Sequence, residues 1–335
     1  QKPASNAIQR SVACTGIYKT RFSNMFNAFF APQSPYRRLM LPGILLAAGL
    51  FSIQLSCKLA PPPPPVMPPI LDQPANYHTG DYLSQWAEID SLDAAGLPQS
   101  ALEKVEALYQ RAKADRNQPQ IVKTLMYRGK YAVMLDDAGM IKAIQLFEQE
   151  AKDAPVPERA ILQSMLGEVY STYLSNQIWV IRDRTPIPEG EGGDILTWSA
   201  DQIERKALEY YNLSVEDEAA LRAVPTDYLK DISLPGQQDT VAKIPLRTNL
   251  YDFLVHRALH HFTSERSYLT QPAYKFYLDG EQAFAPAETF IGAAFSTRDS
   301  TSGKWMAIRL YQKVIAAHIA DKNTAALIDA DLMRL

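Results

Sequence analysis

Three histidines lie close together in a stretch with helical spacing of apolar residues, and they are the first candidates for chemistry. His256 and His260 are four residues apart, so a helix would place them on one face at a spacing that can hold zinc, and His261 follows directly. The residues between the first two include no glutamate to act as a base, and Arg257 would repel a cation. We therefore interpret these histidines as packing or surface residues and expect no metal site.

Carboxylates and glycines offer little further chemistry. Acidic residues cluster at 136–137, at 216–218 and at 329 and 331, and each cluster lies at an expected helix end or on a solvated face. The sequence GEGGD at 190–194 has no strand before it and no Lys-Ser or Lys-Thr after it, and its acids would repel phosphate. No Gly-x-Ser-x-Gly elbow is present. We expect no catalytic residue and no cofactor, and hence a protein that is not an enzyme.

The segment before residue 57 has the layout of an export signal. Arg37 and Arg38 precede an apolar run over 39–56, as in the basic and apolar regions of a secretory signal. The uninterrupted apolar core is shorter than the roughly twenty residues that a membrane-spanning helix needs. We therefore predict a signal peptide, and a short transmembrane helix followed by a proline-rich linker is the alternative.

Cys57 directly follows this signal and is the only residue to which we assign a chemical modification. The preceding Leu55 and Ser56 resemble a bacterial lipoprotein cleavage site, although Gln54 stands where an aliphatic residue is usual. A lipidated Cys57 would become the new N-terminus, and several acyl chains would hold the protein at a membrane. We predict lipidation of Cys57.

A proline-rich stretch follows the cysteine and separates it from the rest of the chain. Prolines occupy 61–65 and 68–69, and such a run favours a stiff polyproline II spacer of about 3.1 Å per residue. The predicted organisation is 1–24, an upstream or disordered segment; 25–56, signal peptide; 57–77, lipidated cysteine and linker; 78–181, helical repeats; 182–198, exposed loop; and 199–335, a further helical region.

Beyond residue 77 the chain reads as a succession of helices. Ala, Leu, Glu, Lys and Gln are frequent, apolar residues recur at helical spacing, and strand signals are sparse. In the clearest helix, 99–115, Leu102, Val105 and Leu108 share one side. We predict an all-α fold of antiparallel helix pairs, arranged as a tetratricopeptide-like or α-solenoid-like array. The expected helices lie near 86–93, 99–115, 119–136, 141–151, 158–176, 199–212, 250–263, 283–295 and 302–320, with a last piece from 324.

The region 78–181 repeats its pattern at an offset of 39 residues. Such a run indicates an αα-hairpin repeat, with a spacing longer than that of a tetratricopeptide repeat. Chance matching among amphipathic helices is the alternative. The matched pairs are Leu102 with Ile141, Val105 with Ile144, Leu108 with Phe147, Ala112 with Ala151, Lys113 with Lys152, Val122 with Ile161, Met126 with Met165, and Tyr131 with Tyr170.

Helix starts in the second half are indicated by capping residues. Ser199 is expected to cap the helix after it, and Ser214 to open a capping box for a short helix that stops before Pro225. The helix at 250–263 would start at Thr248 or Asn249, and the last helix at Thr324. Residues 231–247 read as an irregular connection.

Overall charge and composition limit the kinds of partner. The net charge is −3 and no long basic run is present, so nucleic acid is an unfavourable partner. The chain has four tryptophans and seventeen tyrosines, which could form a recognition surface although most are expected in the core. These features favour a protein-binding segment.

Four stretches together resemble one protein family. WAEIDSLDAAGLPQSALEKVEALYQRAKADRNQPQIVKTLMYRGKY (86–131), LYDFLVHRALHHF (250–262), LTQPAYKF (269–276) and DKNTAALIDADLMRL (321–335) are similar to the N-terminal helical region of large bacterial alpha-2-macroglobulin-family proteins. The resemblance covers roughly 78–335, and the first stretch is its most specific part.

The resemblance implies a location and a role, both of which we state as expectations. The chain would be a fragment of a longer protein, anchored in the bacterial cell envelope and facing the periplasm or the cell surface. Its helical region would lead into macroglobulin domains of an endopeptidase inhibitor that traps proteases. The family's Cys-Gly-Glu-Gln thioester has no counterpart here, so no inhibitory residue is carried over. The alternative is a stand-alone envelope lipoprotein whose helical repeats bind a protein or peptide.

Overall fold

The computed structural model describes residues 79–185, 193–233, 246–264, 269 and 272–335, and these residues fold as helices without a β-strand. The β-contact found within the described ranges is an isolated bridge between Pro225 and Asn249. The predicted all-α class is therefore confirmed. Cys57, the signal peptide, the proline-rich linker and the segment 1–24 lie outside the described residues, as does most of GEGGD.

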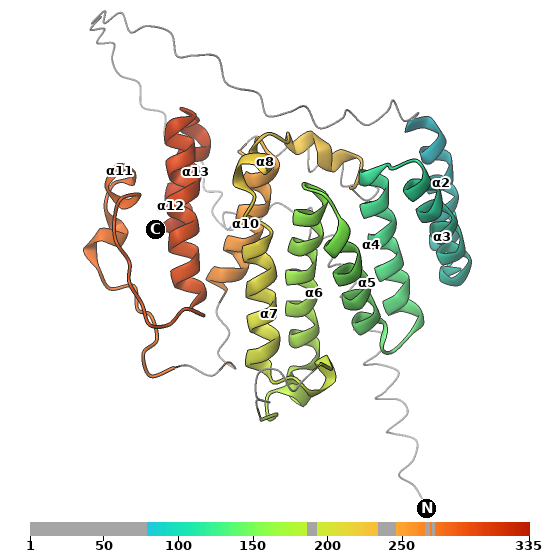
Figure 1. Ribbon diagram of the computed structural model, residues 1–335, viewed down its shortest axis with the longest axis horizontal. Helices are drawn as coiled ribbons and strands as arrows, with labels where there is room; N and C mark the ends of the chain where they lie inside the picture. The colour runs from blue at the N-terminus through green and yellow to red at the C-terminus, as the bar shows by residue number, and fades with distance from the viewer. Residues whose placement is uncertain (1–78, 186–192, 234–245, 265–268, 270–271) are drawn as a thin grey trace, which may run out of the picture.

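Six helices form a row in which each packs against the next, as Figure 1 shows. Short connections reverse the chain after most of them, which makes successive helices antiparallel. Pro98 stands in the first turn of its helix, where its missing amide hydrogen costs nothing. The six helices are α2 (Thr79–Ala94), α3 (Pro98–Ala114), α4 (Gln118–Leu135), α5 (Gly139–Asp153), α6 (Glu158–Ile181) and α7 (Ala200–Leu213).

The second half of the chain continues this packing with three long helices, α10, α12 and α13, and several short helical turns. The helix α10 packs against α6, α7 and α8, α12 packs on α10, and α13 packs on α12 (Figure 1). The elements are η2 (Ile195–Thr197), α8 (Glu218–Arg222), η3 (Thr226–Lys230), α10 (Leu250–Thr263), η4 (Glu281–Phe284), α11 (Ala287–Phe290), α12 (Gly303–Ala320) and α13 (Thr324–Arg334).

The predicted repeat is visible in the burial of matched positions. Val122 and Ile161 are both fully buried, on α4 and α6, and Met126 and Met165 are nearly so. On α3 and α5 the pairs Val105 with Ile144, Leu108 with Phe147, and Ala112 with Ala151 are likewise buried. The helix pair α5–α6 therefore uses the same inward positions as α3–α4.

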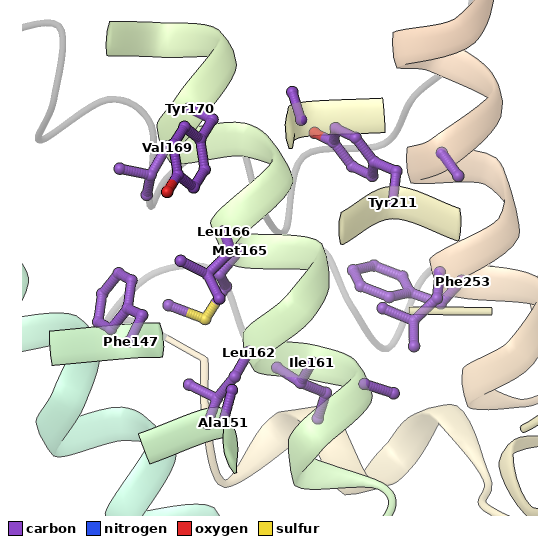
Figure 2. Packing of buried hydrophobic residues seen from close by; sticks show 14 of the residues in the cluster. Phe147, Ala151, Ile161, Leu162, Met165, Leu166, Val169, Tyr170, Tyr211 and Phe253 are labelled. Atoms are coloured by element: carbon purple, nitrogen blue, oxygen red, sulfur yellow. The ribbon is translucent and has the colours of Figure 1, made fainter. Parts of the chain in front are cut away.

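The helix α6 lies at the centre of the array and is covered on most sides. Figure 2 shows Ile161, Leu162 and Met165 among side chains from its neighbours. Gly167 allows α7 to approach closely, because a Cβ atom there would lie 2.6 Å from the ring of Tyr211. This close approach sets the position of α7 relative to α6.

Carboxylates also join helices that are adjacent in the row or separated by one other helix. Tyr127 on α4 donates to Asp90 on α2 at 3.1 Å, and Lys113 on α3 pairs with Glu150 on α5 at 2.6 Å. One oxygen of Glu148, on α5, accepts hydrogen bonds at 2.8 Å from Tyr170 of α6 and Tyr210 of α7. These polar contacts specify which helices pack together, because apolar packing alone is less specific.

Several predicted helix starts are confirmed. Ser199 and Gln202 form a reciprocal capping box at the start of α7. The side chain of Asn249 accepts from the amide of Asp252 and opens α10, and Ser302 opens α12 in the same way. The capping signals at Ser199 and Asn249 therefore locate two helix starts correctly, and α12 starts where the helix at 302–320 was expected.

Three predictions in the second half are wrong. Ser214 does not open a helix, since its hydroxyl donates to the carbonyl of Tyr211 and it ends α7, while the last helix is capped by Asn323 rather than Thr324. The predicted helix at 283–295 is only η4 and the four-residue α11, followed by extended chain. The side chain of Gln312 on α12 donates to the carbonyl of Phe290 at 2.8 Å, which a helix continuing to residue 295 would have used itself.

None of the helices in the described ranges combines the length and the apolar character that crossing a bilayer requires.

Candidate functional site

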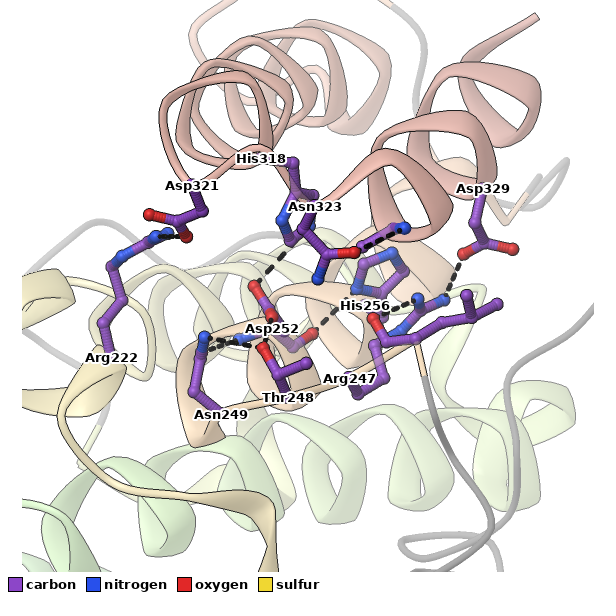
Figure 3. Close-up of polar contacts among 12 residues, drawn as sticks. Arg222, Arg247, Thr248, Asn249, Asp252, His256, His318, Asp321, Asn323 and Asp329 are labelled. Carbon is purple, nitrogen blue, oxygen red and sulfur yellow. Dashed lines mark hydrogen bonds and ion pairs between the residues drawn. The ribbon is translucent and has the colours of Figure 1, made fainter.

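Charged and polar side chains meet inside the protein where α8, α10, α12 and α13 come together, as Figure 3 shows. We call this group the polar centre. The helix α10 contributes two members at successive turns of one face, and the others come from separate elements. The members are Arg222 of α8, Arg247 preceding α10, Asp252 and His256 of α10, His318 of α12, and Asp329 of α13.

Asp252 and His318 form the innermost pair of the polar centre. Asp252 is fully buried, His318 is 1% exposed, and Nε2 of His318 lies 3.7 Å from Oδ1 of Asp252. The other oxygen of Asp252 accepts from the hydroxyl of Thr248 at 3.2 Å. Burial raises the pKa of Asp252, which the nearby His318 partly offsets, and burial lowers the pKa of His318.

His256 is held as a neutral ring beside this pair. Its Nδ1 atom lies 2.7 Å from the carbonyl oxygen of Asp252, so Nδ1 carries the hydrogen and donates it. Burial, together with the charge of Arg247, lowers the pKa of His256 to about 3. Its Nε2 atom is buried without a hydrogen-bond partner among the described residues. The ring therefore stays neutral through the physiological pH range.

Two arginines lie beside the pair of Asp252 and His318, and each forms an ion pair with another aspartate. Arg247 pairs with Asp329 at 2.7 Å, both largely buried, and Arg222 pairs with Asp321. These contacts join α13 and the end of α12 to the residues before α10 and to α8. Because breaking a buried ion pair leaves an uncompensated charge, the polar centre fastens the helices α12 and α13 to the array.

The structure separates the three histidines that the sequence grouped together. His256 belongs to the polar centre and His260 is exposed. His261 is buried, with its Nε2 atom 3.1 Å from Oε1 of Glu204 on α7 and its ring 4.5 Å from that of Tyr211. Within the described part of the chain, no group of three or more His, Cys, Asp or Glu side chains is arranged to hold a metal ion.

The carboxylate clusters have structural partners. Asp136 accepts from the amide of Ala138, and its hydrogen bond with Lys142 lowers its pKa. Asp217 pairs with Arg159 at 3.0 Å. Asp329 belongs to the polar centre, and Asp331 pairs with Arg334 at 2.6 Å. These carboxylates stabilise helix ends and helix contacts.

A groove of about 680 Å³ lies at one end of α7 and α10. Its walls come from α7, from the end of α10, from the segment 272–276 and from 299–304 around the start of α12. The buried pair Glu204 and His261 belongs to the lining, together with exposed side chains such as Tyr274. Sequence reasoning missed this groove because its walls are distant in the chain and no motif marks them.

The four tryptophans divide between core and surface. Trp86 is buried and donates to Gln120 at 2.7 Å, while Trp198 and Trp305 are half-buried against the core. Trp179, near the end of α6, is 74% exposed, and the guanidinium of Arg182 lies 4.7 Å from its ring centroid. One tryptophan therefore stands at the surface in the way that an interface residue does.

The fold and these sites define an all-α protein built as an array of antiparallel helices. Comparisons with models of protein families, with curated proteins and with solved structures give no significant match.

The polar centre predicts a loss of stability in acid. The pKa of His256 is lower in the folded state than its unfolded value of 6.5, so only the unfolded chain gains a proton as the pH falls below 6.5. Between pH 7.5 and pH 5 this lowers the free energy of unfolding by about 2 kcal/mol. We expect the free energy of unfolding of the variant His256→Gln to fall distinctly less than that of the wild type between these two pH values. Urea unfolding at pH 7.5 and at pH 5 measures this difference.

The control is His260→Gln, which alters an exposed histidine of the same helix and should keep the wild-type loss. Equal losses in wild type and His256→Gln would contradict the assignment.

Proposed function

We propose that the chain is a non-catalytic helical segment that binds another protein. The observation that carries this proposal is the array itself, in which each helix packs against the next from α2 to α7 and the packing continues through α10 to α13. Arrays of this kind grow in one direction and present extended surfaces, which proteins commonly use to bind other proteins. The groove beside α7 and the exposed Trp179 lie on such surfaces.

We further propose that this segment belongs to a membrane-anchored bacterial protein of the alpha-2-macroglobulin kind. The support is the sequence resemblance, whose most specific stretch, 86–131, occupies α2 to α4. The stretches 250–262 and 321–335 coincide with α10 and with the α12–α13 turn and α13. The implied role is a part in endopeptidase inhibition by protease trapping. The alternative is a stand-alone envelope lipoprotein whose helices bind a protein or peptide.

Binding can be tested with purified endopeptidases of the serine, cysteine, aspartic and metal-dependent classes and the immobilised full chain. We expect at least one class to bind and Trp179→Ala to weaken that binding about tenfold, since exposed tryptophans are frequent binding hot spots. The matched control is Phe284→Ala, which removes another aromatic ring that is 60% exposed.

Binding that is indifferent to both variants would contradict the role of Trp179. Failure of every endopeptidase, together with Trp179-dependent binding of a different envelope protein, would favour the stand-alone lipoprotein. Turnover of a substrate by the chain alone would contradict a non-catalytic function.

Anchoring depends on Cys57 and can be tested separately. We expect mass spectrometry of the protein from bacterial membranes to show an N-terminus at Cys57 carrying thioether-linked lipid. The variant Cys57→Ser should lose this lipid and move to the soluble fraction, because the modified cysteine would carry the acyl chains that hold the protein at the membrane. An uncleaved, unmodified Cys57 would contradict the proposed anchor.

A further inference from the structure

The part of the chain that connects α10 to α12 forms a second groove, of about 540 Å³. Two stretches of this connection line it as opposite walls. One wall is 274–280 with Gln282, and the other is 294–298. The two walls run antiparallel, because the amide of Phe276 donates to Asp299 at 3.3 Å at one end and the side chain of Gln282 donates to the carbonyl of Ala294 at 3.1 Å at the other.

The second wall is extended chain held rigidly on α12. Exposed and less exposed residues alternate from 293 to 298, as in a strand. Gln312 donates to the carbonyl of Ala293 at 2.7 Å, and the indole of Trp305 donates to that of Phe295 at 3.0 Å. The wall is therefore formed before any ligand arrives, which reduces the entropic cost of binding.

The alternation along 293–298 shows which backbone groups of the second wall point into the groove. In extended chain, the N–H and C=O of one residue point to the same side and those of its neighbours to the opposite side. The carbonyls of Ala293 and Phe295 point to α12. The backbone groups of Ala294 and Ser296 therefore point to the other wall, in agreement with the hydrogen bond from Gln282 to the carbonyl of Ala294. On the first wall, the amide of Phe276 is directed at Asp299 at the end of the second wall.

The second wall presents an unpaired backbone edge to the groove. Within the described part of the chain, no backbone bond joins the two walls, and the amides of Leu278 and Ser296 have no partner. An unpaired edge of extended backbone beside a groove is a feature to which an extended peptide can add through backbone hydrogen bonds, as in β-augmentation.

Charge in the groove favours an anionic side chain. Lys275 and Arg298 line it from opposite walls, and neither has a carboxylate partner among the described residues. The one carboxylate in the lining is that of Asp279, so the lining has a net positive charge. Tyr274 and Tyr277, 58% and 68% exposed, supply aromatic surface.

We propose that this groove binds an extended polypeptide segment carrying a carboxylate side chain. The segment's backbone pairs with the second wall at Ser296, and its carboxylate interacts with Lys275 and Arg298. This inference rests on the proposed protein-binding function and assigns part of the bound partner to a definite place and conformation.

The test uses the full chain and fluorescein-labelled hexapeptides of alternating valine and threonine with one central glutamate, followed by fluorescence anisotropy. We expect the glutamate peptide to bind about tenfold tighter than the same peptide with lysine in place of glutamate. Methylation of the peptide's backbone nitrogens should weaken binding at least about tenfold, because it removes the hydrogen bonds to the walls.

Variants of the protein supply the second half of the test. Arg298→Ala should weaken binding of the glutamate peptide about threefold to tenfold and remove most of the preference over the lysine peptide. The control Lys313→Ala removes an exposed cation of α12 outside this groove and should leave binding unchanged. Circular dichroism of both variants would verify that they fold.

No binding up to about 1 mM, or equal binding of the methylated peptide, would overturn the inference. Self-association of the chain that Arg298→Ala abolishes, without peptide binding, would overturn it in favour of a second copy as the occupant. Trp179-dependent binding of a protein that persists while the peptides fail would leave the proposed function intact and remove only this site.

Discussion

The arrangement of the central helices depends on one carboxylate oxygen. Oε1 of Glu148, on α5, accepts hydrogen bonds from Tyr170 on α6 and Tyr210 on α7, so a single atom joins three helices. Burial and the neighbouring carboxylate raise the pKa of both phenols, which keeps them protonated and able to donate. Apolar packing is tolerant of small shifts, whereas a buried hydrogen bond to a charge is lost when its partners move. Glu148 therefore sets the register in which the apolar faces meet.

The same principle recurs along the array and positions its functional surfaces. Glu168 on α6 accepts from Tyr211 on α7 at 2.8 Å, beside the buried Arg257 of α10. The polar centre then holds α12, and α12 holds the wall 293–298 through Gln312 and Trp305. The second groove is thus connected to the rest of the array through α12. Its rigidity follows from the array and does not depend on a ligand.

Much of the fold could be predicted because its signals are local. Apolar spacing located the main helices of α3 to α7, and the side chains of Ser199 and Asn249 marked two helix starts. Among the pairs matched at the offset of 39 residues, Val105 with Ile144 and Val122 with Ile161 are buried on both helices. Such features depend on residues within a few turns of each other, so one sequence contains them.

The sites could not be predicted in the same way. The polar centre brings Arg222, Asp252 and Asp329 together from elements that are far apart in the chain. The spacing of Asp252 and His256, four apart on an apolar helix face, is a local signal of buried polarity that sequence reasoning did not use. The helix expected at 283–295 failed because Gln312, later in the chain, binds the carbonyl of Phe290 that the helix would have used. Long-range contacts of this kind have no pattern in a single sequence.

The central claim is that the shared oxygen of Glu148 couples α5 to α7. A double-mutant cycle of Glu148→Gln and Tyr210→Phe, measured by urea unfolding of the full chain, tests it most directly. We expect a coupling free energy of at least about 1 kcal/mol, because the hydrogen bond is to a charged group in a partly buried site. Additive effects, with a coupling free energy of only a few tenths of a kcal/mol, would contradict it.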